Sequence, residues 1–450
     1  MPTTVLYASL LRGAGTPSCV MSSSSMAVHP RPFIRGASLG SLFIPENWMY
    51  PSFYAGSGTQ TLCELVRRNH SDAIERMERH LSRFVREADF AWLAAQGFNA
   101  VRVPLGYWNV FGSAGVGIPY VPEQPTTSLR ALDDIFGWGA QHGIQVFLDL
   151  HGAPGSQNGA DHSGCDADGI NWLKGPNVDL SLRTVHALAR RYGKHKALLG
   201  IELLNEPAWA VEWSHGSLLN YYTRALALVR SESPTALVAF NLLFWDDFPS
   251  GFGDWWSGQF VGENIVLDLH LYDCYGAASQ KTLDEHLAQA RAWQRAIERF
   301  RERGHSVIVG EWSLATGVYP GGQAWADAQL DAFAAGVGWF FWSLQTEGGG
   351  DTWSLRGVLE SGIVGLAGNA SRGSVNAAAL ADHYVTNLSA VQSWWLQIPH
   401  FYIGLMSVVA LLTAIGVWYF TRAHIRGANA WNPATPVPED EEPQTEYSRL

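Results

Sequence analysis

The chain has 450 residues, enough for one large domain with additional segments or for two ordinary domains. Its formal net charge is −11 at pH 7 and it contains no long block of Lys or Arg, so nucleic acid is excluded as a main partner. Hydrophobic residues make up 47% of the chain, a fraction typical of folded proteins, so general disorder is excluded as well.

Residues 1–32 form a leader that we interpret as an atypical signal peptide or a disordered segment. Its apolar run is brief, no basic region precedes that run, and an Arg stands at position 12. Three alternatives stay open. The true start lies upstream, the signal is atypical, or a C-terminal helix inserts the chain and leaves the domain in the cytosol; the last is the least favoured.

Eight short apolar runs then alternate with longer segments of helical periodicity. The runs cover residues 33–40, 98–105, 144–152, 198–207, 236–243, 264–272, 305–313 and 338–345. The helical segments cover residues 72–96, 128–142, 180–195, 217–232, 282–303 and 323–335. This alternation predicts an α/β fold with a parallel sheet, and eight repeats predict a closed (β/α)8 TIM barrel, assigned to residues 33–392. An open doubly wound sheet would need a Gly-rich phosphate turn after an early strand, and the sequence has none.

Polar and aromatic side chains stand at the C-terminal ends of the predicted strands. In a barrel of parallel strands these ends meet at one face, where the chemistry takes place. We therefore expect the following residues to lie together: Arg102, His151, Asn205, Glu206, His270, Tyr272, Glu311 and Trp342.

Six motifs carry a resemblance to a known family. RVPLGYW, DLHGAPGSQNG, LLNEP, LHLYD, GEWS and FFWSLQTE occur in this order, and with these intervals the chain resembles glycoside hydrolase family 5 over about residues 33–382. Within that family it is most similar to the fungal exo-β-1,3-glucanases, because DLHGAPGSQNG is specific to that branch. The resemblance implies a retaining β-glycosidase that needs neither a metal nor an organic cofactor.

Two glutamates carry the implied chemistry. A retaining glycosidase needs an acid that protonates the leaving oxygen and a nucleophile about 5 Å away. The resemblance assigns Glu206 as the acid/base and Glu311 as the nucleophile. It implies that Glu206 is protonated and Glu311 ionised in the resting enzyme, with surrounding residues separating the two pKa values. Arg102 and Tyr272 are expected to contact Glu311, and His270 is expected to contact Glu206.

Four further residues are expected to bind the sugar. Asn205 is suited to donate to the 2-hydroxyl, an interaction that strengthens as positive charge develops on the ring. His151 is expected to bind another hydroxyl of the same sugar, and Trp342 to form a stacking floor. Glu46, in the early run SLFIPENW, is expected to bind a hydroxyl of a terminal sugar.

The chain departs from the fungal pattern at two places. After GSQNG it reads Ala160-Asp161-His162, where the fungal enzymes usually have an aromatic residue followed by Asp-Asn. Because that aromatic residue belongs to a clamp at the pocket mouth, Ala160 predicts a wider or differently lined entrance. Near the last strand, Leu344-Gln345 stands where an aromatic or aliphatic residue and Lys are usual. These departures concern the substrate rather than the hydrolysis.

Residues 401–421 predict a transmembrane helix, because they carry no charge over the length of a bilayer core and have aromatic residues at both ends. Residues 393–400 are the juxtamembrane linker, and residues 422–450 an acidic, Pro-rich tail. Basic residues follow the span directly, which predicts a cytoplasmic tail. We expect a single-pass plasma-membrane protein with an extracellular or luminal catalytic domain, and Asn-x-Ser triplets at Asn69, Asn369 and Asn387 are compatible with this.

The four cysteines show no metal-binding pattern. Cys19, Cys63, Cys165 and Cys274 have neither CxxC nor Cys/His spacing, so no zinc site is expected. One disulfide is compatible with an extracellular domain, but the spacing does not identify its partners, and isolated thiols remain the alternative. The expected oligomeric state is a monomer.

The sequence leaves three functions open. The first is an exo-glucanase or β-glucosidase that releases glucose from β-1,3-glucan outside the cell. The second is a β-glucosidase acting on a glycolipid, such as a steryl glucoside or glucosylceramide, because the anchor holds the domain near a lipid surface. The third is a non-catalytic carbohydrate-binding protein for wall attachment, which would not need an acid and a nucleophile.

Overall fold

The computed structural model describes residues 31–116, 125–163, 169–208, 215–241, 262–317, 322–347, 352–362 and 364–365. The predicted leader up to residue 30, juxtamembrane linker, transmembrane helix and tail lie outside the described residues, as do Asn369, Asn387, Cys19 and Cys165. Among the helices of the described ranges, none combines the length and the apolar character that crossing a bilayer requires.

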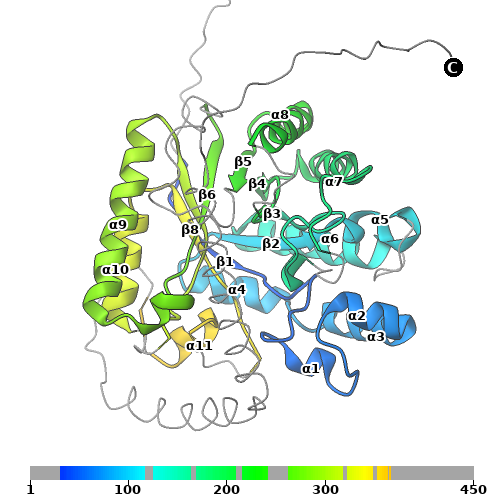
Figure 1. Ribbon diagram of the computed structural model, residues 1–450, viewed down its shortest axis with the longest axis horizontal. Helices are drawn as coiled ribbons and strands as arrows, with labels where there is room; N and C mark the ends of the chain where they lie inside the picture. Colours follow the sequence, from blue (N-terminus) through cyan, green and yellow to red (C-terminus); the bar gives the residue numbers. More distant parts are fainter. Residues whose placement is uncertain are drawn as a thin grey trace, which may run out of the picture. The chain divides into compact units, whose positions relative to one another are not determined.

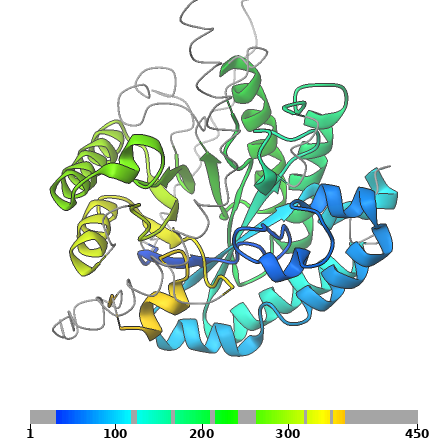
Figure 2. The same ribbon diagram turned by 60° about the horizontal axis from the view of Figure 1, so that its bottom comes forward.

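The eight strands of the described ranges form the predicted barrel (Figure 1). They are β1 (Ile34–Ser38), β2 (Ala100–Gly106), β3 (Gln145–Gly152), β4 (Leu198–Glu202), β5 (Leu237–Asn241), β6 (Ile265–Leu271), β7 (Val307–Trp312) and β8 (Gly338–Phe341). They pair in sequence order, each parallel to the next, and β8 closes the ring on β1. Figure 2 shows the helices around the outside of the strands.

The helices that follow the strands form this outer layer. They are α5 (Tyr107–Val116), α6 (Pro125–His142), α7 (Asn177–Tyr192), α8 (His215–Glu232), α9 (Leu283–Glu302), α10 (Gln323–Phe333) and α11 (Leu355–Glu360). Between β1 and β2 lie α1 (Pro51–Tyr54), α2 (Leu62–Arg68), α3 (His70–Leu81) and α4 (Glu87–Ala95), and two 3₁₀ turns, η1 (Asp161–Ser163) and η2 (Gly276–Gln280), follow β3 and β6.

One predicted helix, over residues 72–96, is two helices in the structure, α3 and α4. The backbone N–H of Arg86 donates to Asp89 Oδ2 at 2.7 Å. A carboxylate in the first turn that reaches back to the preceding N–H begins a helix, and it stabilises the positive end of the helix dipole. The polar residues around position 86 therefore start a second helix rather than continue the first.

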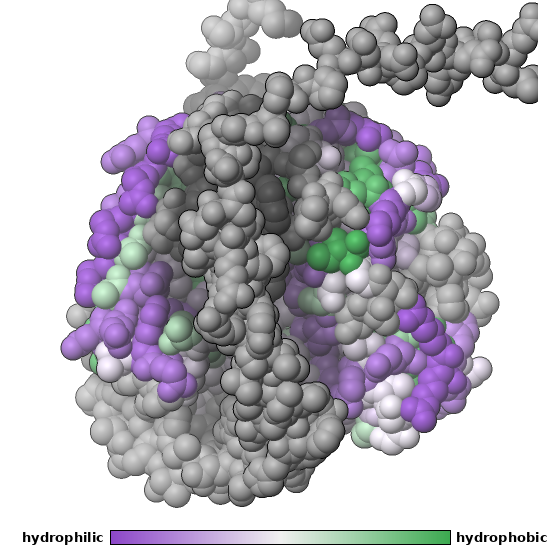
Figure 3. All heavy atoms as spheres, viewed as in Figure 1, coloured by the Kyte–Doolittle hydropathy of each residue, from purple (hydrophilic) through white to green (hydrophobic). Residues whose placement is uncertain are grey.

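α9 illustrates how the sequence builds the outer layer. Thr282 and Glu285 form a capping box at its N-terminus. Trp293, Ile297 and Phe300 are buried, and their spacing of four and three places them on one face of the helix. Hydrophilic side chains cover the side of the molecule where α9 lies (Figure 3).

The barrel interior changes from apolar to charged along the strands. Its apolar layer consists of Ile34, Ala100, Phe147, Leu199, Leu237, Ala239, Val266, Ile308 and Phe340. Because side chains alternate across a strand, the residue two positions later shares the same face. That step leads from Ala100 to Arg102, from Phe147 to Asp149 and from Val266 to Asp268, all buried. The apolar layer is therefore the floor beneath a charged one.

A glycine makes this floor possible. A Cβ atom added at Gly36 would lie 2.0 Å from Phe340 Cδ1, so the Phe340 ring occupies the space that a side chain on β1 would need. The Phe340 ring stacks on that of Phe147, with the ring centroids 5.4 Å apart.

The described cysteines differ in state. Cys63, buried in α2, is disulfide-bonded, whereas Cys274 is a free thiol. Of the two alternatives that the spacing left open, Cys63 shows the disulfide and Cys274 the isolated thiol.

Candidate active site

Arg102 is the centre of the charged layer. Its Nη2 lies 3.0 Å from Asp149 Oδ2 and donates to Asn205 Oδ1 at 2.8 Å. Its Nε donates to Glu202 Oε2 at 2.9 Å and its Nη1 to Glu311 Oε1 at 2.7 Å. Burial alone would lower the pKa of Arg102, but the surrounding carboxylates raise it well above its usual value. The planar guanidinium therefore stays charged and fixes three strands to one another.

Glu311, near the end of β7, is held at both carboxylate oxygens. Oε1 accepts from Arg102, and Oε2 accepts from the Tyr272 hydroxyl at 2.8 Å. His270 Nδ1 lies 3.5 Å from the same Oε2. The structure thus places Arg102 and Tyr272 on Glu311, as the sequence predicts.

Glu206 lies just beyond β4 in a strained backbone conformation. Its φ angle is 41°, in the left-handed region, which costs a residue with a side chain roughly 1 kcal/mol or more. Oε1 faces His270 Nδ1 at 2.6 Å, as predicted, and Oε2 faces His162 Nε2 at 3.1 Å. The loop after β4 therefore presents this carboxyl group between two imidazoles.

The protonation of Glu206 is opposite to the prediction. Burial raises the pKa of this carboxyl group, but His270 and His162 outweigh burial and bring the pKa below its usual range. The prediction that Glu206 itself is protonated in the resting state is therefore wrong. It failed because two imidazoles face Glu206, and the second, His162, comes from η1 rather than from a strand end.

The two imidazoles hold their protons strongly. Burial lowers the pKa of His162, but its contacts with Glu206, Glu46 and Asp161 outweigh burial and raise the pKa to about 9. Burial also opposes the charge on His270, and Glu311 and Glu206 raise its pKa to about 10. The proton that the chemistry needs is thus next to Glu206 rather than on it.

His151, at the end of β3, is an uncharged imidazole. Burial and the Arg102 charge lower its pKa to about 3. Its Nδ1 lies 2.7 Å from Asp149 Oδ2, while its Nε2 is buried with no hydrogen-bond partner among the described residues. With Nδ1–H donating to Asp149, Nε2 is an acceptor for a ligand hydroxyl. The ring stacks on Trp342, with centroids 5.6 Å apart, so the two residues expected to bind one sugar are adjacent.

Asn205 also keeps one polar atom unused. Its Oδ1 accepts from Arg102, which orients the amide, and its Nδ2 is buried with no partner among the described residues. A buried donor without a partner is costly unless a ligand supplies an acceptor. The amide is therefore oriented to donate to a ligand.

A cavity of about 290 Å³ brings these groups together. It is lined by Glu46, Trp48, His151, Asp161, His162, Glu206, Tyr272, Tyr275, Glu311, Trp342 and Trp353. A carboxylate oxygen of Glu206 lies within 4.8 Å of one of Glu311. The cavity therefore has two acids close together and aromatic rings in its lining.

Glu46 occupies the wall of the cavity as predicted. Its Oε2 accepts from Trp48 Nε1 at 2.8 Å. Burial, with a smaller contribution from Asp161, raises the pKa of Glu46 to about 8. A neutral carboxyl group both donates and accepts, which suits a hydroxyl ligand.

Aromatic rings surround the mouth of this cavity. Trp48 is 47% exposed and Tyr275 is 64% exposed. The rings of Trp48 and Tyr272 lie 5.2 and 5.3 Å from that of Trp353. Flat apolar rings that remain exposed beside polar groups are suited to the C–H faces of a carbohydrate or to an apolar group attached to one.

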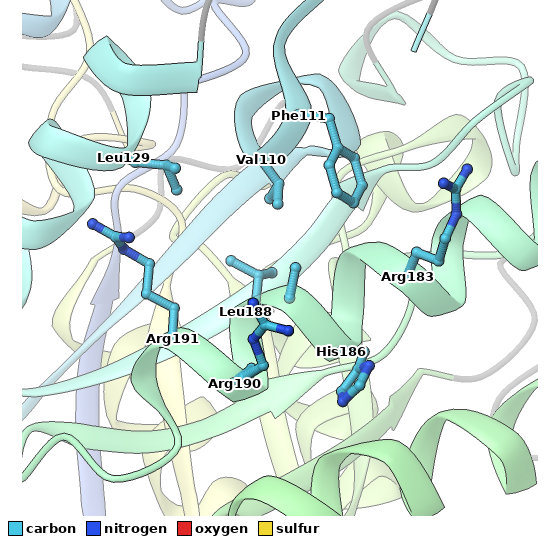
Figure 4. Close-up of a pocket in the computed structure, with 9 residues that line it drawn as sticks. Val110, Phe111, Leu129, Arg183, His186, Leu188, Arg190 and Arg191 are labelled. Carbon is cyan, nitrogen blue, oxygen red and sulfur yellow. The ribbon is translucent and has the colours of Figure 1, made fainter. Parts of the chain in front are cut away.

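A second hollow, of about 470 Å³, lies outside the barrel between α5, α6 and α7 (Figure 4). Its lining combines apolar residues such as Phe111 and Leu188 with Arg183, Arg190 and Arg191. The described residues that line it include no carboxylate pair. The chemistry therefore belongs to the cavity at the strand ends, although the outer hollow is larger.

Comparison with known proteins identifies the family. The model of "Cellulase (glycosyl hydrolase family 5)" matches residues 67–348. The chain belongs to glycoside hydrolase family 5. It is 32% identical over 379 residues to the "Probable glucan 1,3-beta-glucosidase A" of Emericella nidulans, covering 73% of this chain and 89% of that protein. It is 30% identical over 382 residues to the "Glucan 1,3-beta-glucosidase" of Blumeria graminis, covering 74% and 86%.

A solved structure supports the fold alone. The rutinosidase from Aspergillus niger covers 74% of this chain and 97% of its own, with a TM-score of 0.62 and 18% sequence identity. The family and its relatives make this protein a glycosidase, which excludes the non-catalytic wall-attachment protein as its function.

Several residues of this family 5 site were missed in the sequence. Asp149 and Asp268 stand two positions before His151 and His270, so the alternation of a strand would have placed them on the same inward face. Glu202 had no such signal, and Trp353 stands beyond the last strand. His162 was noted only as a departure from the fungal pattern, because η1 is not a strand end.

The second departure from the fungal pattern, at Leu344-Gln345, does not line the cavity. Gln345 Nε2 donates to the backbone carbonyl of Phe84 at 2.5 Å, and Leu344 is buried. Of the two departures, only the one at residues 160–162 contributes described residues to the cavity lining.

Among the described residues, three side-chain groups have the spacing of metal ligands: Glu46 with Asp161 and His162, Glu202 with Asp268 and His270, and Glu206 with His270 and Glu311. In the third group Glu206 Oε1 faces His270 Nδ1 at 2.6 Å, and Glu311 Oε2 accepts from the Tyr272 hydroxyl at 2.8 Å, so both oxygens have a partner without an ion. The absence of a metal or cofactor stays a prediction.

Proposed function

We propose that this protein is a retaining β-glycosidase that releases glucose from β-1,3-glucan, with Glu311 as the nucleophile and Glu206 as the acid/base. The observation that carries the proposal is the separation of the two carboxylates, whose nearest oxygens lie within 4.8 Å. Retaining enzymes have their carboxyl groups about 5–5.5 Å apart, whereas inverting enzymes leave about 6.5–9.5 Å for a water molecule. The named relatives support β-1,3-glucan as the substrate.

The reaction follows from the contacts of each residue. Glu311 Oε2 attacks the anomeric carbon from the side held by Tyr272, while a proton delivered at Glu206 leaves with the aglycone oxygen. Water then attacks the same carbon, gives its proton back at Glu206 and releases Glu311. Asn205 Nδ2 and His151 Nε2, both without described partners, bind hydroxyls of the sugar, and Trp342 supports its ring.

A glycolipid is the second candidate substrate. The exposed rings of Trp48 and Tyr275 at the mouth favour it, because they would contact an apolar aglycone as readily as a second sugar. The full chain incubated with laminarin and with a steryl glucoside separates the two, with released glucose followed by NMR. Glucose released first as the β-anomer supports retention, and the α-anomer contradicts it.

We also propose that residues 401–421 anchor the protein as a single-pass span in the plasma membrane, with the barrel outside and the tail in the cytoplasm, and that the protein acts as a monomer. The uncharged apolar sequence of residues 401–421 and the basic residues after it support this. The full chain should sediment with membranes in alkaline carbonate, whereas a chain ending at residue 400 should not. Protease added to intact cells should remove the barrel.

Glu206→Gln tests the acid/base role through the leaving group. We expect kcat/KM for laminaribiose to fall about 10³-fold, because general acid catalysis contributes about 10²–10⁴-fold. With 2,4-dinitrophenyl β-D-glucoside, whose leaving group needs no proton, kcat/KM should stay within about threefold. Glu232→Gln, a change on α8 beside His186, is the matched control and should leave both values unchanged. An equal loss on both substrates would contradict the role of Glu206.

A further inference from the structure

His162 is an imidazole at hydrogen-bond distance from the proposed acid/base. It belongs to η1, after β3, and its Nε2 lies 3.1 Å from Glu206 Oε2. His270 faces the other oxygen, Oε1, at 2.6 Å. The carboxyl group of Glu206 is therefore held from both sides, and the two imidazoles have different surroundings.

His270 is a fixed hydrogen-bond donor to Glu206. Its Nε2 lies 3.0 Å from Asn241 Nδ2, and the same amide also donates to Glu202 Oε1 at 3.2 Å. This placement favours the neutral ring, whereas the charges of Glu311 and Glu206 raise the pKa of His270 and favour the charged one. In either state Nδ1 carries a hydrogen, and that hydrogen points at Glu206. His270 therefore keeps the same bond to Glu206 whichever state it adopts.

The neighbours of His162 have opposite effects on the protonation of its Nε2. The amide of Asn158 is oriented by Ala160, whose N–H donates to Asn158 Oδ1 at 3.0 Å, so Asn158 Nδ2 turns its hydrogens to His162 Nε2 at 2.7 Å. That contact favours an Nε2 without a proton. The carboxylates of Asp161 and Glu206, joined by Glu46 once it ionises above about pH 8, favour an Nε2 with a proton.

Only one proton fits between His162 Nε2 and Glu206 Oε2. If it is on Glu206, Nε2 accepts from both Glu206 and Asn158; if it is on Nε2, the contact with Asn158 is lost and an ion pair with Glu206 forms. Two groups coupled this closely titrate as a pair rather than singly.

We propose that His162 is a positioning residue that shares one proton with Glu206, so that the His162–Glu206 pair, and not Glu206 alone, is the general acid and base of this enzyme. This inference rests on the function proposed above. In the first step the pair's proton passes through Glu206 to the leaving oxygen as its bond to the anomeric carbon breaks and the bond to Glu311 forms. In the second step, water forms its bond to that carbon, the bond to Glu311 breaks, and the proton of the water returns to the pair.

The pair has a defined set of charged neighbours. Glu46 and Asp161 face His162, and His151, which is neutral, lies with its ring centroid 5.5 Å from that of His162. On the side of Glu206 the described titratable neighbours are Glu311, whose carboxylate lies within 4.8 Å, and His270, Asp149, Tyr272, Tyr275 and His151, whose pKa values respond to its charge. The imidazole makes the pair a much weaker acid than Glu206 alone, so the proton stays available at higher pH.

His162→Asn replaces the ring with the residue usual in the fungal enzymes. In the wild-type protein we expect kcat/KM for laminaribiose to decline on the alkaline side with an apparent pKa near 9, the value to which His162 is raised. In His162→Asn the proton has only Glu206 to reside on, so this decline should move down by about one pH unit or more. At pH 8 the variant should be about twofold slower or more, and at pH 10 about tenfold slower or more.

A leaving-group comparison separates this effect from structural damage. For 2,4-dinitrophenyl β-D-glucoside, kcat/KM reports only formation of the glycosyl-enzyme, and it should stay within about threefold in His162→Asn. The matched control is His186→Asn, an imidazole on α7 that is 38% exposed and pairs with Glu232, and it should leave the pH profile unchanged. An alkaline decline that stays in place in His162→Asn, or an equal loss on both substrates, would overturn the proposal.

An NMR titration tests the pair without turnover. In the full chain labelled with ¹⁵N-histidine, the imidazole signals of His162 are identified by their loss in His162→Asn or, if that variant does not fold, in His162→Gln. Their midpoint should lie near 9 and fall by about one unit or more in Glu206→Gln. An unchanged midpoint would overturn the shared proton. If the midpoint moves but no β-glucoside is hydrolysed, the pair exists and the proposed function is the part that fails.

Discussion

Replacing Glu311 with glutamine is expected to abolish turnover, with kcat lower by about 10⁴-fold or more. An amide does not form the glycosyl ester that the proposed mechanism requires. The site should otherwise stay intact. The amide oxygen would still accept from Arg102 Nη1, and the amide nitrogen would donate to the Tyr272 oxygen, now 2.8 Å from Glu311 Oε2. Binding of the substrate, measured by calorimetry, should therefore change by less than about tenfold.

A smaller side chain identifies the role of Glu311 more directly. In Glu311→Ala, azide should enter the space left by the carboxylate and restore turnover of 2,4-dinitrophenyl β-D-glucoside, giving an α-glucosyl azide. A purely structural glutamate would show no such rescue. Glu75→Gln, an exposed change on α3, is the control and should retain wild-type kcat. Turnover within tenfold of wild type in Glu311→Gln would contradict the nucleophile assignment.

The sequence predicted the barrel and most of the cavity because both depend on simple periodicity. Eight apolar runs separated by helical segments are sufficient for a closed parallel sheet, and the residue at the end of each strand must then face the same opening. Glu206 and Glu311 were found in this way, and the structure brings their oxygens within 4.8 Å. Their catalytic roles stay predictions that the variants above test.

The rule that strand ends face one opening does not predict the charged layer beneath the cavity. Asp149 and Asp268 are one alternation further down the strands, where an unpartnered carboxylate would be too costly. Asp149 pairs with Arg102 at 3.0 Å, whereas Asp268 Oδ1 accepts from the Gly310 N–H at 2.6 Å and burial raises the pKa of that carboxyl group. His162 and Trp353 come from segments beyond the strand ends. Their approach to the cavity depends on loop conformation, which hydrophobic periodicity does not determine.

The protonation of Glu206 shows the limit of assigning roles by resemblance. The fungal pattern usually has Asn where this chain has His162, and His162, 3.1 Å from Glu206 Oε2, adds to the larger effect of His270 in lowering the pKa of that carboxyl group. Both acids were located correctly, yet the position of the proton depended on a neighbour from a different loop. Catalytic acids can thus be found from strand ends, whereas their pKa values require the packed structure.

Arg102→Met is expected to have the largest effect on stability. Arg102 contacts Asp149, Glu202 and Glu311 at hydrogen-bond distance. Apart from histidine rings, it is the only cation among the described groups that does so. Breaking a buried ion pair by removing one partner costs about 3–5 kcal/mol, a large part of the roughly 5–15 kcal/mol that stabilises a typical domain. The free energy of unfolding, measured with urea, should fall by that amount at pH 8. Arg79→Met, which removes an exposed pair with Glu75, should change it by less than about 1 kcal/mol.

The loss caused by Arg102→Met should depend on pH in a defined direction. Burial already raises the pKa of Asp149 to about 7 and raises that of Glu202, and both rise further when the guanidinium is removed. Between their unfolded pKa values, about 4, and these raised values, the folded variant binds more protons than the unfolded chain, so its stability falls as pH rises. The difference in the free energy of unfolding between wild type and Arg102→Met should therefore be smaller at pH 5 than at pH 8. A difference that is the same at both pH values would mean that Arg102 acts by packing rather than by compensating the buried carboxylates.

Arg102→Lys keeps one charge but not the planar set of donors, so it should recover part of the stability. Its kcat should stay low, because Glu311 and Asn205 lose the guanidinium that contacts both of them.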